Sequence, residues 1–348
     1  MSDTPGLSWP DLITTLVGGS DLSAAQTAWA MDEVLAGAAS PVQIAGFVVA
    51  LRAKGETVEE ISGLVDAMYR HAVRLDLPGR WVDVVGTGGD RSMSVNISSM
   101  AAIVAAGAGV PVIKHGNRSA SSKAGAADVL ELLGVRLDLG PDQVRKVAEE
   151  VGISFCFAPA FHPALRHAAI ARKELAVATV FNFLGPLANP GSPSAQAIGC
   201  ADLRMAPIMA GVFARRGVDA WVFRGDDGLD ELTTTTTSHL WRVASGEVVE
   251  VVVDPTELGL PRSRPGDLRG GDAAHNADVV RRVLAGEQGP VRDAVLLNAG
   301  AAIAVHADES GSVTDQLAQG LERARAAVDS GAAEQALARW VEAGAALG

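Results

Sequence analysis

The fold is decided by WVDVVGTGGDRSMSVNISSMAAIVAAGAGVPVIKHGNRSASS, residues 81–122. This stretch holds two apolar runs, and each is followed by a glycine-rich loop, GTGGD at residues 86–90 and KHGNRSASS at residues 114–122. A glycine-rich turn that leads into a helix brings several backbone N–H groups and the positive end of the helix dipole to one place, which suits a phosphate. Two such loops in close succession predict a substrate with two phosphate groups.

Outside this stretch the chain alternates between strand-like and helix-like segments. Residues 81–85 have the apolar bias of a buried parallel strand, and further strands are expected at 110–113, 153–158 and 220–223. Helices are expected at 123–133, 141–151, 162–175 and 205–216, and mostly alanine-rich helix from 273 to 346. Residues 240–244 and 247–253, joined at Ser245-Gly246, are typical of a β-hairpin.

The N-terminal part of the chain is different in character. Residues 9–75 have the pattern of short amphipathic helices, with Ser8 or Ser40 as caps, Pro10 or Pro41 in the first turn, and Gly55 and Gly63 as interruptions. The predicted fold class is therefore α/β, with a small all-helical N-terminal domain and a larger domain built on a mainly parallel sheet flanked by helices. We expect the helical domain at 1–77, with a returning helical segment near 163–185, and the α/β domain at 80–160 and 195–348.

Composition limits the classes of function. The net charge of −12 argues against tight binding to nucleic acid or to an anionic membrane. Cys156 and Cys200 lack CxxC spacing, so neither a disulfide framework nor a metal cluster is expected. We expect a cytoplasmic location. Residues 92–113 carry no charge, but their asparagine, serines, glycines and proline argue against a membrane span.

The first loop fits neither of the two commonest glycine-rich phosphate motifs. A dinucleotide fingerprint needs GxGxxG, and the glycines at 86, 88 and 89 have the wrong spacing. A P-loop needs Gly-Lys followed by Ser or Thr, which is absent here. Neutral and basic donors come after the loop instead, and far downstream acidic residues crowd around Gly228. Mg²⁺ typically uses one or two carboxylates together with substrate phosphates, so a Mg²⁺-diphosphate substrate would join both groups.

The strings VGTGGD, NISS, KHGNRSASS, FAPAFHPALRHAA, FNFLGPLANP and DGLDELTTTTTS, taken in order, resemble the anthranilate phosphoribosyltransferase family across essentially the whole chain. This resemblance implies an enzyme of L-tryptophan biosynthesis that transfers the 5-phosphoribosyl group of phosphoribosyl pyrophosphate to the amine of anthranilate. The products are N-(5-phosphoribosyl)anthranilate and pyrophosphate. It also implies a cytoplasmic homodimer that uses Mg²⁺, two ions per subunit, and binds neither nucleic acid nor membrane.

The resemblance also assigns residues. It implies that phosphoribosyl pyrophosphate is bound by Gly86, Gly89, Asp90, Ser94, Asn96, Ile97, Ser98, Ser99, Lys114, His115, Gly116, Asn117, Arg118, Ser119, Ala120, Ser121, Ser122 and Ala126. It implies metal ligands at Ser98, Asp230 and Glu231, and anthranilate contacts at Gly86, Asn117 and Arg172. No covalent nucleophile is implied. The reaction needs a stabilised leaving group and a positioned amine, and no general base is nominated.

The chain departs from the family pattern at a few positions. Ser99 stands where threonine is usual, and Ala126 where serine is frequent. Ala176 and Ala178 replace the glycine and arginine of the common string LGxRT.

Several plainer interpretations remain open at this stage. Asp230 and Glu231 alone would be typical of a solvated surface pair, Arg172 of an ordinary helix surface, and His115 and His162 of packing as much as of binding. Two relatives of the same fold are the rival functions. A non-enzymatic nucleic-acid binder should be basic, and a pyrimidine nucleoside phosphorylase should carry a different phosphate loop.

Overall fold

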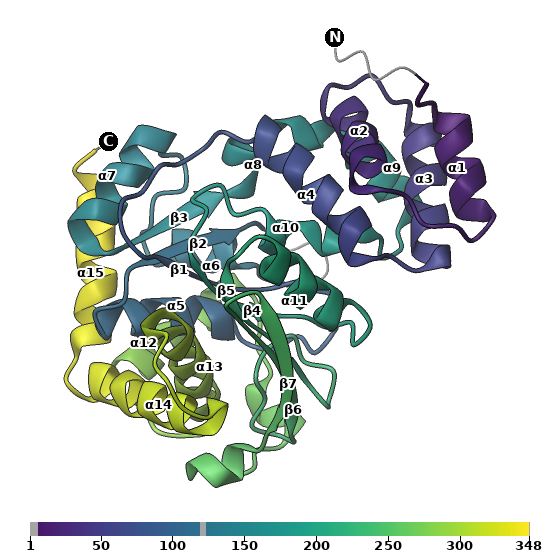
Figure 1. The fold of residues 1–348 in the computed structure, drawn as a ribbon. Helices are drawn as coiled ribbons and strands as arrows, with labels where there is room; N and C mark the ends of the chain where they lie inside the picture. Colours follow the sequence, from purple (N-terminus) through teal and green to yellow (C-terminus); the bar gives the residue numbers. More distant parts are fainter. Residues whose placement is uncertain (1–5, 119–122, 348) are drawn as a thin grey trace.

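A helical domain lies beside an α/β domain in the computed structural model, which describes residues 6–118 and 123–347 (Figure 1). The helical domain contains α1 (Trp9–Val17), α2 (Ala24–Leu35), α3 (Pro41–Lys54) and α4 (Val58–His71). The later helix α9 (Ala169–Leu175) packs against α3 and thereby joins this domain.

The helical domain forms where its caps predict. The side chains of Ser8 and Ser40 accept hydrogen bonds from backbone N–H groups in the first turns of α1 and α3. Gly55 ends α3 with φ of +96°. Gly63 does not interrupt a helix as expected, because it lies inside α4, where a Cβ would overlap the Ala24 carbonyl of α2. Its small size allows these two helices to approach closely.

The α/β domain is built on a seven-stranded sheet in the order β3-β2-β1-β4-β5-β6-β7. Its strands are β1 (Val82–Gly86), β2 (Val112–Gly116), β3 (Ile153–Phe157), β4 (Ala195–Gly199), β5 (Asp219–Gly225), β6 (Ser238–Ala244) and β7 (Glu247–Val253). The first five are parallel, and β6 and β7 are antiparallel. The hairpin β6–β7 turns at Ser245 and Gly246, both with positive φ, as its sequence predicts.

Side chains of the central strands alternate between two cores, one on each face of the sheet. Trp221 and Phe223 of β5 belong to a core shared with α5 (Ile97–Gly107) and α13 (Pro290–Ala307). Ala220 and Val222 belong to a core that includes α11 (Met205–Arg215) and the helical domain. The predicted fold class, a mainly parallel sheet flanked by helices next to a helical domain, is confirmed.

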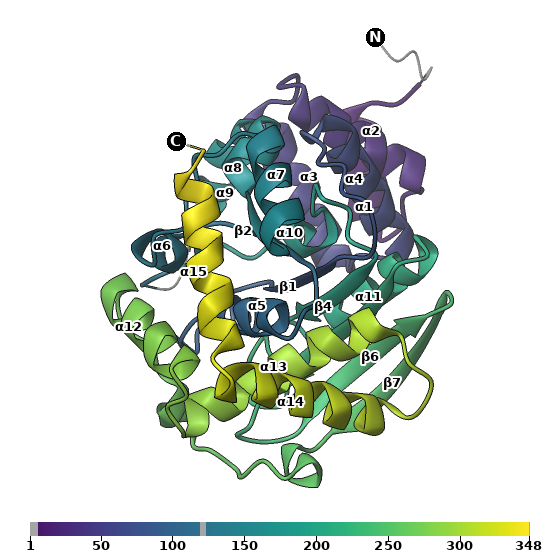
Figure 2. The same cartoon turned by 90° about the vertical axis from the view of Figure 1, so that its left-hand side faces the viewer.

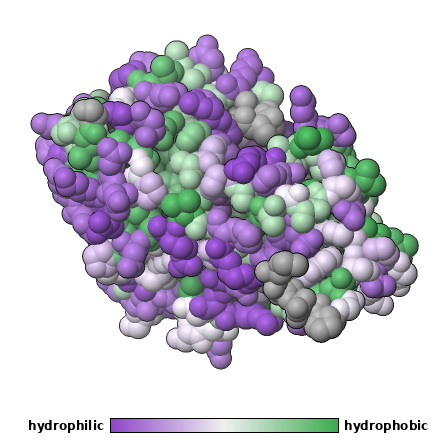
Figure 3. Space-filling view, turned by 90° about the horizontal axis from the view of Figure 1, so that it is seen from above, coloured by the Kyte–Doolittle hydropathy of each residue, from purple (hydrophilic) through white to green (hydrophobic). Residues whose placement is uncertain are grey.

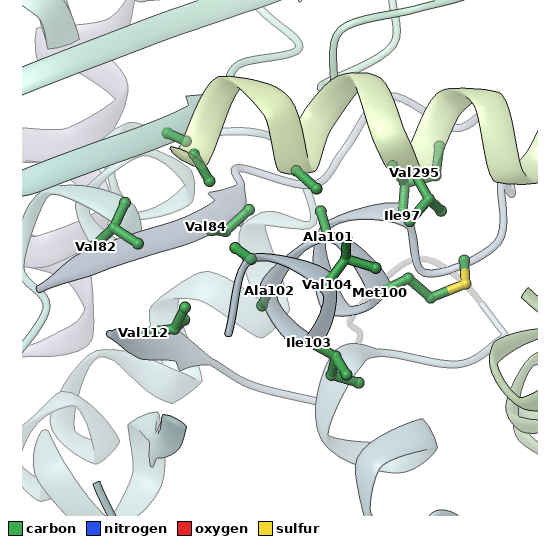
Figure 4. Close-up of a cluster of buried hydrophobic side chains, with 14 of the residues drawn as sticks. Val82, Val84, Ile97, Met100, Ala101, Ala102, Ile103, Val104, Val112 and Val295 are labelled. Carbon is green, nitrogen blue, oxygen red and sulfur yellow. The ribbon is translucent and has the colours of Figure 1, made fainter. Parts of the chain in front are cut away.

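Helix α5 carries the middle of the opening stretch into this core. Its residues Met100, Ile103 and Val104 are buried near Val82 and Val84 of β1 (Figure 4). The remaining α-helices among the described residues are α6 (Ala126–Leu132), α7 (Pro141–Val151), α12 (Ala273–Leu284), α14 (Val313–Asp329) and α15 (Ala332–Ala345), with the short α8 (Ala158–Phe161) and α10 (Leu184–Leu187). Figure 2 shows α15 alongside α5 and α7, with which it is in contact. None of the described helices has the length and apolarity that crossing a bilayer requires.

Candidate functional site

Both glycine-rich loops leave the sheet at the same edge. They follow the carboxyl ends of β1 and β2, which are parallel neighbours, and this edge is where open α/β sheets commonly bind ligands. Four of the five parallel strands end in glycine, at Gly86, Gly116, Gly199 and Gly225. A Cβ on Gly86 would overlap the Asp230 carboxylate, and one on Gly199 would overlap the Asp230 carbonyl. At Gly86 and Gly199 this edge of the sheet therefore presents only backbone, which we call the backbone floor. The segment that carries Asp230 packs directly on it.

The first loop is held open by residues with positive φ and tied to the acidic segment. Gly88 and Gly89 have φ of +71° and +85°, which side-chain-bearing residues rarely adopt. The Gly88 N–H donates to Asp230 Oδ2 over 2.6 Å. Asp90 accepts hydrogen bonds from the backbone and hydroxyl of Ser92. The loop thus presents its backbone toward Asp230, far away in sequence.

The N-terminus of α5 is closed by a carboxylate from the same segment. Asn96 stands at the N-cap position but makes no capping bond to the first turn. Instead the Ser98 N–H donates to Glu231 Oε1 over 3.0 Å. A helix N-terminus favours an anion, so Glu231 sits where a phosphate would also be attracted. Ser99 lies in the same turn, and its hydroxyl is buried with no partner among the described residues.

Asp230 and Glu231 are buried, only 9% and 7% exposed, so they are not a solvated surface pair. Burial, and then the nearby Asp90 carboxylate, raise the pKa of Asp230 to about 7. Burial, and then Asp230, raise the pKa of Glu231 well above its ordinary value. A divalent cation would offset this crowding of negative charge. With the Ser98 hydroxyl, the pair forms the hard oxygen donor set that Mg²⁺ prefers, so these residues fit that ion.

Lys114 of β2 supplies a cation close to the Asp230–Glu231 pair and the N-terminus of α5. Its side chain is 1% exposed and its ammonium donates to the Val84 carbonyl and, over 3.4 Å, to Ser98 Oγ. Burial lowers the pKa of Lys114, while the carboxylates of Asp83, Glu231 and Asp230 oppose that shift. A buried cation close to the acidic pair and the α5 N-terminus is suited to neutralise a departing phosphate group.

A second polar group lies below Lys114 and was not predicted from the sequence. Asp83 of β1 is fully buried, and it accepts from the His115 N–H over 3.1 Å and from Asn189 Nδ2 over 2.8 Å. Asn189 also donates to the Ile113 carbonyl. The available signal was Asp83 itself, because a charged residue inside an apolar strand requires buried partners.

The second loop is only partly described. Gly116 ends β2 and Asn117 follows it, and Asn117 Oδ1 accepts from the Arg118 N–H over 2.7 Å. The Arg118 guanidinium pairs with Asp128 and Glu131 of α6, at 2.6 and 3.0 Å. Ser119, Ala120, Ser121 and Ser122 lie outside the described residues. Ala126 is the first residue of α6 and has no side-chain donor to offer.

Two neutral histidines lie next to each other, and one of them, His115, belongs to β2. The rings of His115 and His162 are 5.2 Å apart. His115 Nδ1 bonds the Gly185 carbonyl and His162 Nε2 the Ala188 carbonyl, so each of these nitrogens carries a hydrogen. Burial, and then His162, lower the pKa of His115 to about 3, and burial lowers that of His162. His115 Nε2 is therefore a buried acceptor, and it has no partner in the described part of the chain.

Arg172 stands on α9, on the helical side. Its guanidinium lies over the Phe181 ring, 5.4 Å from the centroid, and among the described residues no carboxylate pairs with it. Arg172 is exposed, and the surrounding protein lowers its pKa by removing part of its hydration. The segment after α9 connects this arginine to the carbonyls of Gly185 and Ala188 that hold the two histidines. An unpaired guanidinium stacked on an aromatic ring suits a ligand with both a carboxylate and a ring.

Two protein families and many individual proteins are similar to this chain. Residues 78–334 match the glycosyl transferase family, a/b domain, and residues 10–72 match the helical bundle domain of the same family. The anthranilate phosphoribosyltransferase of Nocardioides sp. is 69% identical over 97% of this chain and 98% of its own length. That of Streptomyces griseus is 60% identical over 97% and 95%.

The chain belongs to the anthranilate phosphoribosyltransferase family.

Solved structures of anthranilate phosphoribosyltransferases share the whole architecture. The crystal structure from Thermus thermophilus has a TM-score of 0.89 and 40% identity, covering 96% of this chain and 99% of that one. The structure from Saccharomyces cerevisiae in complex with PRPP and Mg has a TM-score of 0.88 and 25% identity, covering 97% and 98%. The family fold therefore extends over both domains of this chain.

One departure from the pattern of anthranilate phosphoribosyltransferases has a visible cost. Ala176 ends α9 with φ of +50°, a left-handed conformation that glycine adopts freely. Glycine is common at this position because it adopts this backbone conformation without strain. Alanine there should lower the stability of the folded protein by about 1 kcal/mol. Ala178 is exposed and the structure offers no explanation for its replacement of arginine.

Proposed function

We propose that this chain transfers the 5-phosphoribosyl group from phosphoribosyl pyrophosphate to the amine of anthranilate in L-tryptophan biosynthesis. The observation that carries the proposal is the convergence of the buried Asp230–Glu231 pair on the glycine loop and the N-terminus of α5. Membership of the anthranilate phosphoribosyltransferase family, with 69% identity to the relative from Nocardioides sp., supports it.

In the proposed site, the two loops hold phosphoribosyl pyrophosphate. The first loop and the start of α5 face the pyrophosphate through Gly86, Gly89, Asp90, Ser94, Asn96, Ile97, Ser98 and Ser99. Lys114 through Asn117 would bind the phosphoribosyl group, together with residues 118–122 and Ala126, of which 119–122 lie outside the described residues. Arg118 forms ion pairs with two acidic residues of α6, and these ion pairs must break before Arg118 can bind phosphoribosyl pyrophosphate.

Mg²⁺ would be held by Ser98, Asp230 and Glu231, with two ions per subunit. When bound, Mg²⁺ would neutralise charge on the departing pyrophosphate. Support for the ion comes from the donor set and from the S. cerevisiae relative, which binds PRPP and Mg. Metal removal should therefore abolish turnover without unfolding the chain.

Anthranilate would be oriented by Arg172, with Gly86 and Asn117 nearby. A guanidinium can hold the carboxylate of anthranilate through two parallel hydrogen bonds. The amine nitrogen then forms a bond to the anomeric carbon while the bond from that carbon to the pyrophosphate oxygen breaks, and the amine loses a proton. An aromatic amine is neutral at pH 7, so positioning and charge neutralisation carry the reaction.

The protein as a whole is proposed to act as a cytoplasmic homodimer, with domains at 1–77 and at 80–160 and 195–348. Exposed apolar residues on the packed helices α3 and α9 support a dimer face: Val42 is 81% exposed, Ile170 56% and Val49 43%. We call these three residues the α3–α9 face. Figure 3 shows hydrophobic residues at the surface on the side of the helical domain.

The decisive experiment is a fluorescence assay with purified protein. Anthranilate fluorescence should fall when phosphoribosyl pyrophosphate and Mg²⁺ are both present, and should stay constant when either is omitted. A parallel incubation with thymidine and phosphate should give no free base. Unchanged anthranilate fluorescence, or release of thymine, would contradict the proposal.

A further inference from the structure

The segment before α12 runs across the loop that leads into α5. The Val95 N–H donates to the Leu268 carbonyl over 3.0 Å, and the Gly270 N–H donates to the Met93 carbonyl over 2.8 Å. Ser94 and Arg269 form an antiparallel bridge between these two bonds. The loop that is proposed to bind pyrophosphate is therefore paired with a segment remote in sequence.

Asn276 is the side chain that joins this segment to the site. It lies in α12, is 3% exposed, and uses both ends of its amide. Its Oδ1 accepts from the Gly271 N–H over 2.8 Å, and its Nδ2 donates to Asn96 Oδ1 over 2.8 Å. A Cβ on Gly270 would lie 2.8 Å from Asn276 Oδ1, so the backbone there approaches as closely as only glycine allows.

These contacts fix the direction of two amides in series. A backbone N–H can only donate, so the Gly271 N–H requires the oxygen of Asn276 to face it. The nitrogen of Asn276 must then face Asn96, and the side-chain oxygen of Asn96 must accept the hydrogen bond from it. The nitrogen of Asn96 is thereby turned the other way, toward the loop after β2, where it donates to the Ala124 carbonyl over 3.3 Å.

Asn96 is one of the residues proposed to contact phosphoribosyl pyrophosphate. An amide nitrogen carries two hydrogens, and the described residues show one acceptor for them. With this orientation, Asn96 offers a donor to an anionic ligand, whereas the opposite orientation would offer an oxygen that repels it.

We propose that Asn276 is a positioning residue that sets the amide orientation of Asn96, so that Asn96 presents a hydrogen-bond donor to phosphoribosyl pyrophosphate. The inference rests on the proposed function. It assigns Asn276 no contact with the substrate: its oxygen is engaged by Gly271 and its nitrogen by Asn96.

The test compares Asn276→Asp with Ala274→Asp. The carboxylate in Asn276→Asp still accepts from the Gly271 N–H, but it can no longer donate to Asn96, so Asn96 turns its oxygen toward the ligand. We expect the KM for phosphoribosyl pyrophosphate to rise about tenfold or more, and the KM for anthranilate to change less than about twofold. Ala274→Asp adds the same charge at an exposed position of the first turn of α12 and should leave both KM values unchanged.

Two further measurements keep the inference testable. Asn276→Ser retains a hydroxyl that can donate and accept without a new charge, so its KM for phosphoribosyl pyrophosphate should exceed the wild-type value by less than about tenfold. This variant tests the inference on its own if Asn276→Asp fails to fold. In an Asn96→Ala background, Asn276→Asp should have no further effect on that KM.

The outcomes separate cleanly. Failure of the wild-type protein to bind phosphoribosyl pyrophosphate with Mg²⁺ in calorimetry would refute the proposed function. If the wild-type protein binds normally, any of three results would overturn the role of Asn276. These are equal rises in both KM values, additive effects of the Asn276 and Asn96 substitutions, or no change in either Asn276 variant.

Discussion

Asp230 and Glu231 differ from the many other acidic pairs of this chain in being buried against the backbone floor of the sheet. Their neutral counterparts have nearly the same shape, so Asp230→Asn combined with Glu231→Gln should preserve the fold. Turnover should fall by a factor of about 100 or more, because charge on the leaving group would lose its counterion. The measurement is kcat against Mg²⁺ concentration, with the melting temperature as a check of folding. Wild-type Mg²⁺ dependence in the double variant would remove the metal assignment.

Arg172 provides the corresponding test for the acceptor substrate. Arg172→Ala should raise the KM for anthranilate about tenfold or more, since a charge-assisted pair is lost, and should leave the KM for phosphoribosyl pyrophosphate within about twofold. Lys173→Ala, at the neighbouring exposed position, serves as the control and should alter neither constant. Equal increases in both constants would argue against an anthranilate contact.

Asp83 predicts a pH dependence of stability. Burial raises the pKa of Asp83 from 3.8 to about 6, although Lys114 and Asn189 oppose the shift. The folded state therefore prefers the protonated carboxyl, and stability from this group is complete below pH 4 and lost as the pH rises through 6. Between pH 4 and pH 7 the difference in unfolding free energy between wild type and Asp83→Asn should change by about 3 kcal/mol, in favour of the variant at the higher pH.

Chemical denaturation at several pH values measures this difference. A difference for Asp83→Asn that does not change with pH would mean that the pKa of Asp83 is the same in the folded and unfolded states, and would contradict this prediction.

At the scale of elements, the site depends on strands that end in glycine. In Gly199→Ala the new Cβ would overlap the Asp230 carbonyl, so the acidic segment must move off the floor. We expect turnover to fall by about 100-fold and the melting temperature to drop, because overpacking against backbone has little room to relax. Gly266→Ala is the matched control, since nothing lies within 4 Å of its Cβ and its φ is ordinary. Equal activity of the two variants would show that the segment can shift without consequence.

Much of this element pattern is readable from sequence, and the failures have physical causes. The hairpin at Ser245-Gly246, the caps at Ser8 and Ser40, and the strands around β1, β3 and β5 follow from local preferences that packing reinforces. Strand β4 was not expected, because three of the five residues in AQAIG are alanine or glycine, which have little preference for strands, and only pairing with β1 and β5 defines it. The helix expected at 162–175 forms as a 3₁₀ segment, Pro163–Ala168, followed by α9.

The candidate site was predictable to the extent that its residues are contiguous in sequence. The two loops and the acidic pair are short strings, and resemblance to a family is carried by such strings. The roles of Asp83, Asn189 and Asn276 were not predictable, because each acts through partners far away in the chain, at Asn189–Asp83 and Asn276–Asn96 for example. Only the folded structure shows which side-chain amide donates a hydrogen bond to which carboxyl or carbonyl group far away in the sequence.

At the scale of the molecule, the helical domain is fastened to the site by ion pairs. Arg52 of α3 pairs with Asp202, and Arg204 pairs with Glu56, which also lies 3.6 Å from Arg52. Asp202 and Arg204 follow β4, and just before them the Ala201 N–H donates to Thr87 Oγ1 of the first glycine loop. The position of the helical domain is thereby linked to the loop proposed to hold pyrophosphate.

The α3–α9 face predicts the oligomeric state. Val42→Asp places a charge on the most exposed valine of that face, and burying an unpaired charge in an interface is costly. Sedimentation analysis should find a dimer for the wild type and a monomer for Val42→Asp. The control is Val252→Asp, at a 57% exposed position on β7, which should remain dimeric. A wild-type monomer, or a dimer that both substitutions leave intact, would contradict the assignment of this face.

The glycine ends of the parallel strands also limit how this enzyme could be redesigned. A pocket is usually retuned by exchanging the side chains that line it, but here one wall is peptide backbone with no side chain to exchange. Libraries aimed at accepting other aromatic amines should therefore leave positions 86, 116, 199 and 225 fixed. The useful diversity lies in α9 and in the segment that follows it, where new shapes and charges can be introduced without disturbing the sheet.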